Sequence, residues 1–271
     1  MACRIASTHP TRLAFAAAIL VALIAGVTAR AQTVAPPALA PVVPFSKTCQ
    51  GGSSALAEES PLPNVAIALK ERKSLRILAF GAAPGRVSKR GGYTSLIESM
   101  LESALKGIDV TMINRGVSGE LAANAATRMK NDVALEHPDL VLWQVGTNDA
   151  LAFVDADEFA HIVKDQVDWL KAHKVDVVLV GLQFAPQMLR DNHYVQVRDQ
   201  LRKLAAEENV IVIRFYEAMQ IINQVSGVAS APVADEFERN EAGYSCLAQY
   251  VARAITLGVF GKNMPSRPPP K

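Results

Sequence analysis

The sequence has little of several features that mark particular classes of protein. Only 3 of its 271 residues are cysteine and 6% are aromatic, which excludes a small scaffold held together by many disulfides. Charged residues make up 20% of the chain and nearly balance, at a formal net charge of +2, so we expect no nucleic-acid partner. Half of the residues are hydrophobic, which is enough for one full-sized core and excludes a disordered chain.

The chain begins with the pattern of a secretory signal peptide. Arg4 and Arg12 precede an uninterrupted apolar run at 13–27, and a small-x-small cleavage site ends at Ala31. The run is shorter than the roughly 20 apolar residues of a membrane span. We therefore expect residues 1–31 to be removed and the protein to be exported, either to the periplasm or out of the cell. No stable membrane span would remain after signal removal; an uncleaved signal anchor is the alternative.

Removal of this segment changes the charge and the cysteine count. It takes away three arginines and no acidic residue, so the formal charge falls from +2 to −1. It also takes away Cys3, which leaves Cys49 and Cys246. An even pair in an oxidising compartment favours a disulfide. Such a bridge would close a long loop and stabilise the fold by about 4 kcal/mol in the chain-entropy model. Two buried free thiols are the alternative.

Composition divides the chain into four parts. Residues 1–31 form the signal peptide, and residues 32–70 form a Pro/Ala-rich linker and an amino-terminal segment. One folded domain is predicted over 71–260, and a Pro-rich tail over 261–271.

Within the domain, apolar runs alternate with amphipathic stretches. The runs predict five buried strands, at 75–80, 108–114, 139–145, 175–182 and 209–215. The stretches between and after them predict helices at about 96–105, 121–135, 156–172, 194–208 and 242–257. Strands that are apolar throughout are covered on both faces. The sequence therefore predicts an α/β fold with a five-stranded parallel sheet between helices and a ligand site beyond the carboxyl ends of the strands.

Several predicted strands end in residues suited to binding a ligand. Gly81 follows the first strand, Gly119 follows the second, and Gly146 and Asn148 follow the third. Glycines let backbone N–H groups approach a ligand closely, and Gly119 with Asn148 can cradle an oxyanion. A tight turn with a helix cap would explain any one of these sites alone. Three at one edge of the sheet favour a ligand site.

These strand-end motifs resemble those of the SGNH (GDSL-type) hydrolase family, over about residues 75–257. The motifs are Gly81 at the first strand end, Asn114-x-x-x-x-Gly119, Gly146-Thr147-Asn148-Asp149 and Asp235-x-x-Glu238. The resemblance implies a flavodoxin-like three-layer α/β/α sandwich and the hydrolysis of esters, often of acyl groups. It implies an oxyanion-binding role for Gly119 and Asn148, and it implies neither a metal nor an organic cofactor.

Two positions depart from the family pattern. Where the family has its serine nucleophile this chain has Ala83, and where it has its histidine base this chain has Glu238; only Asp235 remains of the triad. Alanine has no nucleophilic atom, so a covalent acyl-enzyme cannot form at that position. In subtilisin, the loss of the serine or the histidine alone lowers turnover by roughly 10⁶.

Three functions stay open at this point. The first is a non-catalytic protein that keeps an oxyanion-type pocket for a small acyl or carbohydrate ligand. The second is an active esterase or deacetylase in which Glu238 activates water, as carboxylates do in inverting glycosidases. The third is an envelope scaffold or interaction protein that uses the surface of the fold.

Overall fold

The computed structural model describes residues 42–50, 60–81, 92–184, 188, 190–225 and 241–261. All of them belong to one compact unit that begins at Leu39. The predicted signal peptide lies outside the described residues, as do residues 32–41 and 51–59 of the predicted linker and amino-terminal segment and all but the first residue of the predicted Pro-rich tail.

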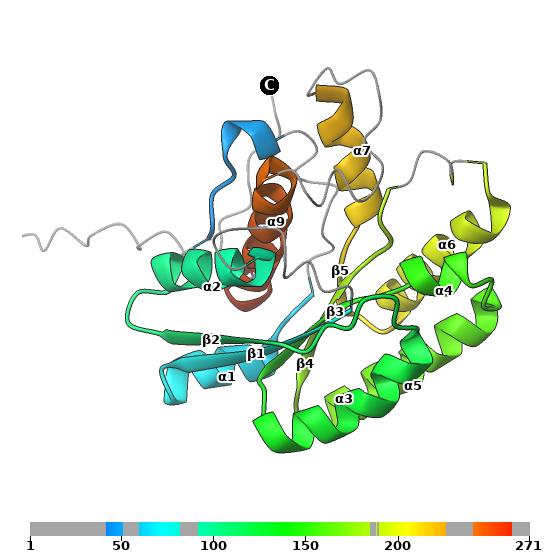
Figure 1. Cartoon of the computed structure of the whole chain (residues 1–271). Helices are drawn as coiled ribbons and strands as arrows, with labels where there is room; N and C mark the ends of the chain where they lie inside the picture. The colour runs from blue at the N-terminus through cyan, green and yellow to red at the C-terminus, as the bar shows by residue number, and fades with distance from the viewer. Residues whose placement is uncertain are drawn as a thin grey trace, which may run out of the picture. The chain divides into compact units, whose positions relative to one another are not determined.

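A parallel five-stranded sheet lies between two layers of helices (Figure 1). Its strands are β1 (Ser74–Phe80), β2 (Asp109–Asn114), β3 (Leu140–Gln144), β4 (Asp176–Val180) and β5 (Ile211–Ile213). They lie in the order β2-β1-β3-β4-β5, and all four pairings are parallel. The predicted fold class, a three-layer α/β/α sandwich around a five-stranded parallel sheet, is confirmed.

The helices divide between the two faces of the sheet. One layer contains α2 (Gly92–Ala104), α7 (Phe215–Val225) and α9 (Glu241–Phe260), and the other contains α3 (Ala122–Glu136), α5 (Ala156–Ala172) and α6 (Asn192–Glu207). Three shorter elements complete the described fold: η1 (Lys47–Cys49), α1 (Pro63–Glu71) and α4 (Thr147–Leu151).

Burial explains the apolar runs of the sequence. Every residue of β3 and β4 is buried, because helices cover both faces of the centre of the sheet. The edge strand β2 alternates between exposed and covered residues. Its Met112 backbone N–H donates to the Glu98 carboxylate on α2 over 2.9 Å. This bond occupies a donor on an exposed sheet edge, where an unpaired donor invites another strand.

At the last strand, hydrophobicity alone does not show where the strand ends. A strand was predicted over 209–215, whereas β5 spans only Ile211–Ile213 and Phe215 already begins α7. The apolar run continues from the strand into the helix, so its length does not mark the boundary. The helices α1, α4 and α7 were not predicted. The first two are too short to show a clear helical period, and the start of α7 was assigned to the last strand.

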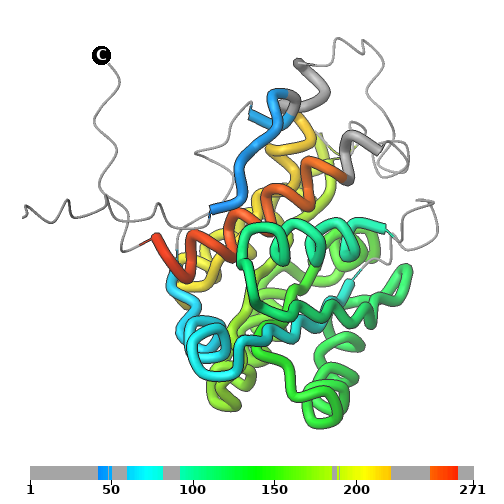
Figure 2. The backbone as a smooth tube through the Cα atoms, turned by 90° about the vertical axis from the view of Figure 1, so that its left-hand side faces the viewer, coloured from blue at the N-terminus to red at the C-terminus, as the bar shows by residue number. Residues whose placement is uncertain are grey.

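Residues 42–50 lie along α9 (Figure 2). The predicted disulfide is present between Cys49 and Cys246, with 5.3 Å between their Cα atoms. The Tyr250 hydroxyl donates to the carbonyl of Cys49 over 2.9 Å, and Phe45 packs edge-on against the Tyr250 ring. Val43, which composition assigned to the linker, is buried. The amino-terminal segment is therefore part of the folded unit from at least this residue.

We expect the disulfide to dominate the stability of this attachment. It closes a loop with a sequence separation of 197, and its removal should lower the free energy of unfolding by about 5 kcal/mol in the chain-entropy model. The measurement is urea unfolding of the native protein with and without reductant, beside a Cys49→Ser/Cys246→Ser double variant. Reductant should not affect the double variant. Equal midpoints for the oxidised and reduced native protein would contradict this prediction.

Candidate ligand site at the carboxyl edge of the sheet

The strand order reverses between β1 and β3. The chain leaves β1 for β2 on one side of the sheet and then returns to β3 on the other side. In open parallel sheets, ligands bind at the carboxyl ends of the strands at such a reversal. Gly81 follows β1 and Asn148 lies just beyond β3, while Gly119 lies in the loop after β2. The three predicted ligand-binding residues therefore follow three neighbouring strands at the same edge.

Packing requires glycine at two of the turns at this edge. Gly81 has φ +105°, and a Cβ there would lie 2.1 Å from the carbonyl oxygen of Gln144. Gly146 has φ +102°, and its Cβ would lie 2.6 Å from a methyl of Leu182. Both absent side chains make room for the protein itself. The sequence interpretation, in which these glycines bring backbone amides close to a ligand, is not needed to explain either of them.

Gly119 differs from these two. It has φ +78°, and a Cβ built there would meet nothing within 4 Å among the described residues. Its backbone conformation favours glycine, but the neighbouring space is open. The loop before it begins with a short turn, in which the Asn114 side-chain oxygen accepts a hydrogen bond from the Gly116 N–H over 2.8 Å.

Two hydrogen bonds join the loops that carry Gly119 and Asn148. The Asn148 amide donates to the carbonyl of Glu120 over 3.0 Å, and the Asp149 carboxylate accepts from the N–H of Ala122 over 2.8 Å. The second bond satisfies a free donor at the start of α3. A side-chain amide nitrogen carries two hydrogens, so the Asn148 bond to Glu120 leaves it one further donor.

Two buried polar side chains flank this junction. Asp149 is only 2% exposed, and burial raises the pKa of its carboxyl group, although the hydrogen bond from Ala122 opposes that shift. Gln144, the last residue of β3, is also buried, and neither polar atom of its amide has a hydrogen-bond partner in the described part of the chain. A buried amide without a hydrogen-bond partner lowers the free energy of unfolding by about 1–3 kcal/mol.

The residues that would carry catalysis lie elsewhere in the chain. Ala83, Asp235 and Glu238 fall outside the described residues, so their roles stay predictions from the sequence. Among the residues that the structure does describe, no group of three or more His, Cys, Asp or Glu side chains could hold a metal ion. No helix in the same part of the chain is long and apolar enough to cross a membrane.

Comparison with known families identifies the fold and the family. The sequence pattern of the non-GDSL lipase-like family matches residues 48–260, which includes every strand. The chain belongs to this family. The resemblance to SGNH (GDSL-type) hydrolases is thereby confirmed.

Characterised relatives are esterases by name. Esterase TesA of Pseudomonas aeruginosa is 24% identical over 141 residues, which are 52% of this chain and 67% of that protein. An arylesterase of Vibrio mimicus is 29% identical over 138 residues, which are 48% of this chain and 67% of that protein. Among solved structures, an acetyl xylan esterase, AlAXEase, has a TM-score of 0.58 at 20% identity, over 67% of this chain and 100% of that one. The structural likeness shows the fold.

In this member of the non-GDSL lipase-like family, Arg128 on α3 holds the loop that carries Gly119. The Arg128 guanidinium donates to both carboxylate oxygens of Glu120, over 2.8 and 3.1 Å. It also donates to the carbonyl of Arg115 over 2.7 Å. One side chain thus binds both ends of the loop. Sequence reasoning missed it, because Glu120 and Arg128 are eight residues apart and follow no local motif.

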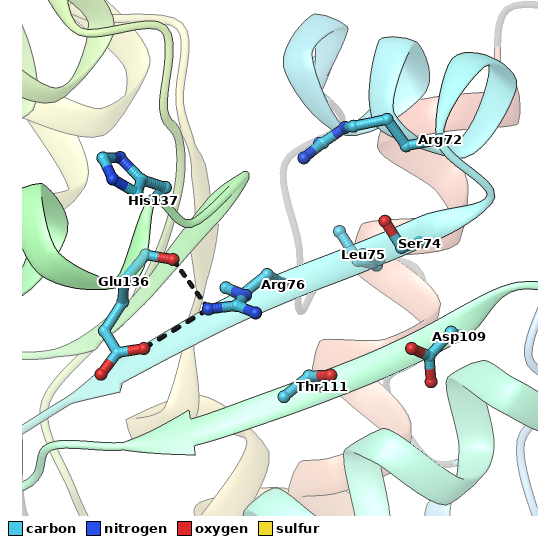
Figure 3. A pocket seen from close by; sticks show the side chains of 8 residues that line it. All are labelled: Arg72, Ser74, Leu75, Arg76, Asp109, Thr111, Glu136 and His137. Carbon is cyan, nitrogen blue, oxygen red and sulfur yellow. Dashed lines mark hydrogen bonds and ion pairs between the residues drawn. The ribbon is translucent and has the colours of Figure 1, made fainter.

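The same face carries further ion pairs toward the opposite edge of the sheet. Asp132 pairs with Arg128 and Arg115, and Glu136 pairs with Arg115 and Arg76. Arg76 and Glu136 line a cavity of about 390 Å³ at the amino ends of β1 and β2 (Figure 3). Arg72, which also lines it, pairs with the buried Asp139. Both arginines therefore already have carboxylate partners.

The bonds from Arg128 to Glu120 and Arg115, here called the Arg128 clamp, lead to a testable prediction. Arg128→Gln would leave the Glu120 carboxylate, which is 8% exposed, without its cation, and this should lower the free energy of unfolding by about 2–3 kcal/mol. Amide hydrogen exchange in residues 115–120 should become faster. The matched control is Arg76→Gln, at the exposed end of the same chain of ion pairs, which should cost less than about 1 kcal/mol. Equal losses in the two variants would contradict a specific role for Arg128.

The raised pKa of Asp149 sets the direction of a pH effect. Because burial raises its pKa in the folded state, the folded protein binds this proton more tightly than the unfolded chain does. The contribution of Asp149 to stability should therefore increase as pH falls from 7 toward 4. Asp149→Asn removes the titration and can still accept from Ala122. Denaturant unfolding of both proteins across this range measures the difference, and a native protein that loses stability relative to the variant on acidification would refute the prediction.

Proposed function

We propose that this chain is an exported member of the family that binds a small acyl or carbohydrate ligand at the carboxyl edge of its sheet without hydrolysing it through a serine. The observation that carries the proposal comes from the sequence: Ala83 stands at the nucleophile position of the family, whereas the oxyanion-binding positions keep Gly119 and Asn148. Gly119 and Asn148 lie in loops joined by hydrogen bonds, and Asn148 keeps a donor for a ligand oxygen. An oxyanion hole without a nucleophile binds acyl oxygens and catalyses little.

Export is part of the proposal and rests on two features. The first 31 residues have the layout of a secretory signal peptide. The Cys49–Cys246 disulfide supports the same view, because disulfides persist in oxidising compartments outside the cytoplasm.

An esterase that uses Glu238 is the second candidate. The named activities of the relatives favour it, since an esterase TesA and an arylesterase are both similar to this chain. In such an enzyme the Glu238 carboxylate would take a proton from water, and the hydroxide would attack the ester carbonyl directly. The proton that Glu238 takes from water would then pass to the departing alkoxide, which leaves as the alcohol.

Hydrolysis of p-nitrophenyl acetate separates the two candidates. We expect the purified native protein and a Glu238→Ala variant to release p-nitrophenol at the same rate as each other. Ala83→Ser combined with Glu238→His should gain activity, because it restores both missing groups of the triad. In that background Asn148→Ala should lower kcat by about 10²-fold, the usual effect of losing an oxyanion donor. Native activity that disappears in Glu238→Ala would instead establish the esterase.

Ligand binding needs its own measurement. A ligand that binds the folded protein stabilises it, so acetylated xylohexaose should raise the unfolding temperature of the native protein. Asn148→Ala should remove most of this rise if an acyl oxygen accepts from the Asn148 amide. The same rise in both proteins would place the acetyl group elsewhere.

A further inference from the structure

We propose that Phe153, supported by His193, is a stacking platform for a neutral sugar ring next to the candidate site. This inference rests on the proposed function for its ligand class and specifies which part of a carbohydrate ligand is bound and where. No sequence motif pointed to this pair, because the two residues lie 40 positions apart, Phe153 in the turn after α4 and His193 in α6.

Phe153 is unusual both in its exposure and in its backbone conformation. Its side chain is 72% exposed although it is a large aromatic, and its backbone has φ +55°, in the left-handed region. It terminates α4, where its N–H donates to the carbonyl of Ala150 and the N–H of Val154 donates to the carbonyl of Asp149. Helices that end in this way usually have glycine at the left-handed position. Backbone strain of this kind accumulates at functional sites.

The location of Phe153 separates it from other strained residues. Four more non-glycine residues in the described part of the chain have positive φ: Lys73, His137, Lys174 and Asn209. All four lie in turns that lead into the amino ends of strands. Phe153 instead lies at the carboxyl edge, and its turn is bonded to Asp149, the residue next to Asn148.

His193 gives the Phe153 ring a fixed orientation. The two rings stack with centroids 5.5 Å apart and an interplanar angle of 22°. His193 lies in the first turn of α6, where its own N–H donates to the Asp191 carboxylate over 2.9 Å. Its Nε2 atom is buried and has no hydrogen-bond partner among the described residues. One face of Phe153 therefore rests on the imidazole, and the exposure of the side chain leaves contact area for a ligand.

The surroundings favour a sugar as the ligand. Gln196 and Gln200 are three and seven residues after His193, so they share its face of α6. Gln200 donates to the Asp157 carboxylate over 2.5 Å. Amide and carboxylate groups pair with hydroxyls, whereas a flat aromatic face packs against the C–H face of a sugar ring. An acyl chain would gain little from a single open ring, because apolar ligands are bound by enclosing them.

Substitutions at Phe153 separate ligand binding from folding. The Phe153→Gly variant removes the ring and suits the left-handed backbone, so its unfolding temperature should be no lower than that of the native protein. Phe153→Trp keeps an aromatic face. By isothermal titration with xylohexaose, Phe153→Gly should raise Kd at least tenfold and Phe153→Trp should stay within about threefold. The control is Leu135→Ala, an equally exposed apolar residue on α3, which should leave Kd unchanged.

The outcomes distinguish this inference from the proposed function. No measurable binding of xylohexaose by the native protein, or an unchanged Kd in Phe153→Gly, would overturn the platform, whatever happens at Asn148. If Phe153→Gly weakens xylohexaose binding while Asn148→Ala leaves the binding of acetylated xylohexaose unaffected, the platform stands and the acyl pocket fails. A loss confined to an acyl probe such as p-nitrophenyl decanoate would also overturn the sugar assignment.

Discussion

The candidate site depends on the junction between the loop after β2 and the turn after β3. Asn148 bonds to the carbonyl of Glu120 and Asp149 bonds to the N–H of Ala122, so two successive side chains of one loop fix the other. At the ends of β1 and β3, a Cβ at position 81 would clash with the carbonyl of Gln144, so only glycine fits there. The strand reversal brings these segments together, and the side-chain bonds fix their separation.

Both side chains at this junction also have a structural role. Asp149 satisfies a free donor at the start of α3, and Asn148 holds the Gly119 loop. Both residues would therefore be useful to the fold even without a ligand. Within the described ranges, no protein contact accounts for the second N–H of Asn148, the open space at Gly119 or the buried amide of Gln144. They are compatible with the ligand binding that we propose, and such binding needs no nucleophile at Ala83.

Sequence reasoning succeeded where one chemical pattern determines one structure. Apolar runs predicted the five strands of the sheet, of which β3 and β4 are buried throughout, and the two cysteines left after Cys3 form the bridge. It was wrong at β5, where apolar residues continue past Ile213 into α7. It missed the Arg128 clamp, because a contact between α3 and a loop depends on how the chain folds back and leaves no spacing to recognise.

Phe153 departs from the preferences of its residue type, and this departure points to a functional role. An exposed aromatic with a left-handed backbone contradicts both the burial preference and the backbone preference of its residue type. Glycine at the same place would end α4 with less strain, and a polar side chain would be better solvated. The ring stacks on His193, whose buried Nε2 has no hydrogen-bond partner among the residues that the structure describes. The sugar ring that we propose would supply the contact that the open face of Phe153 lacks in the free protein.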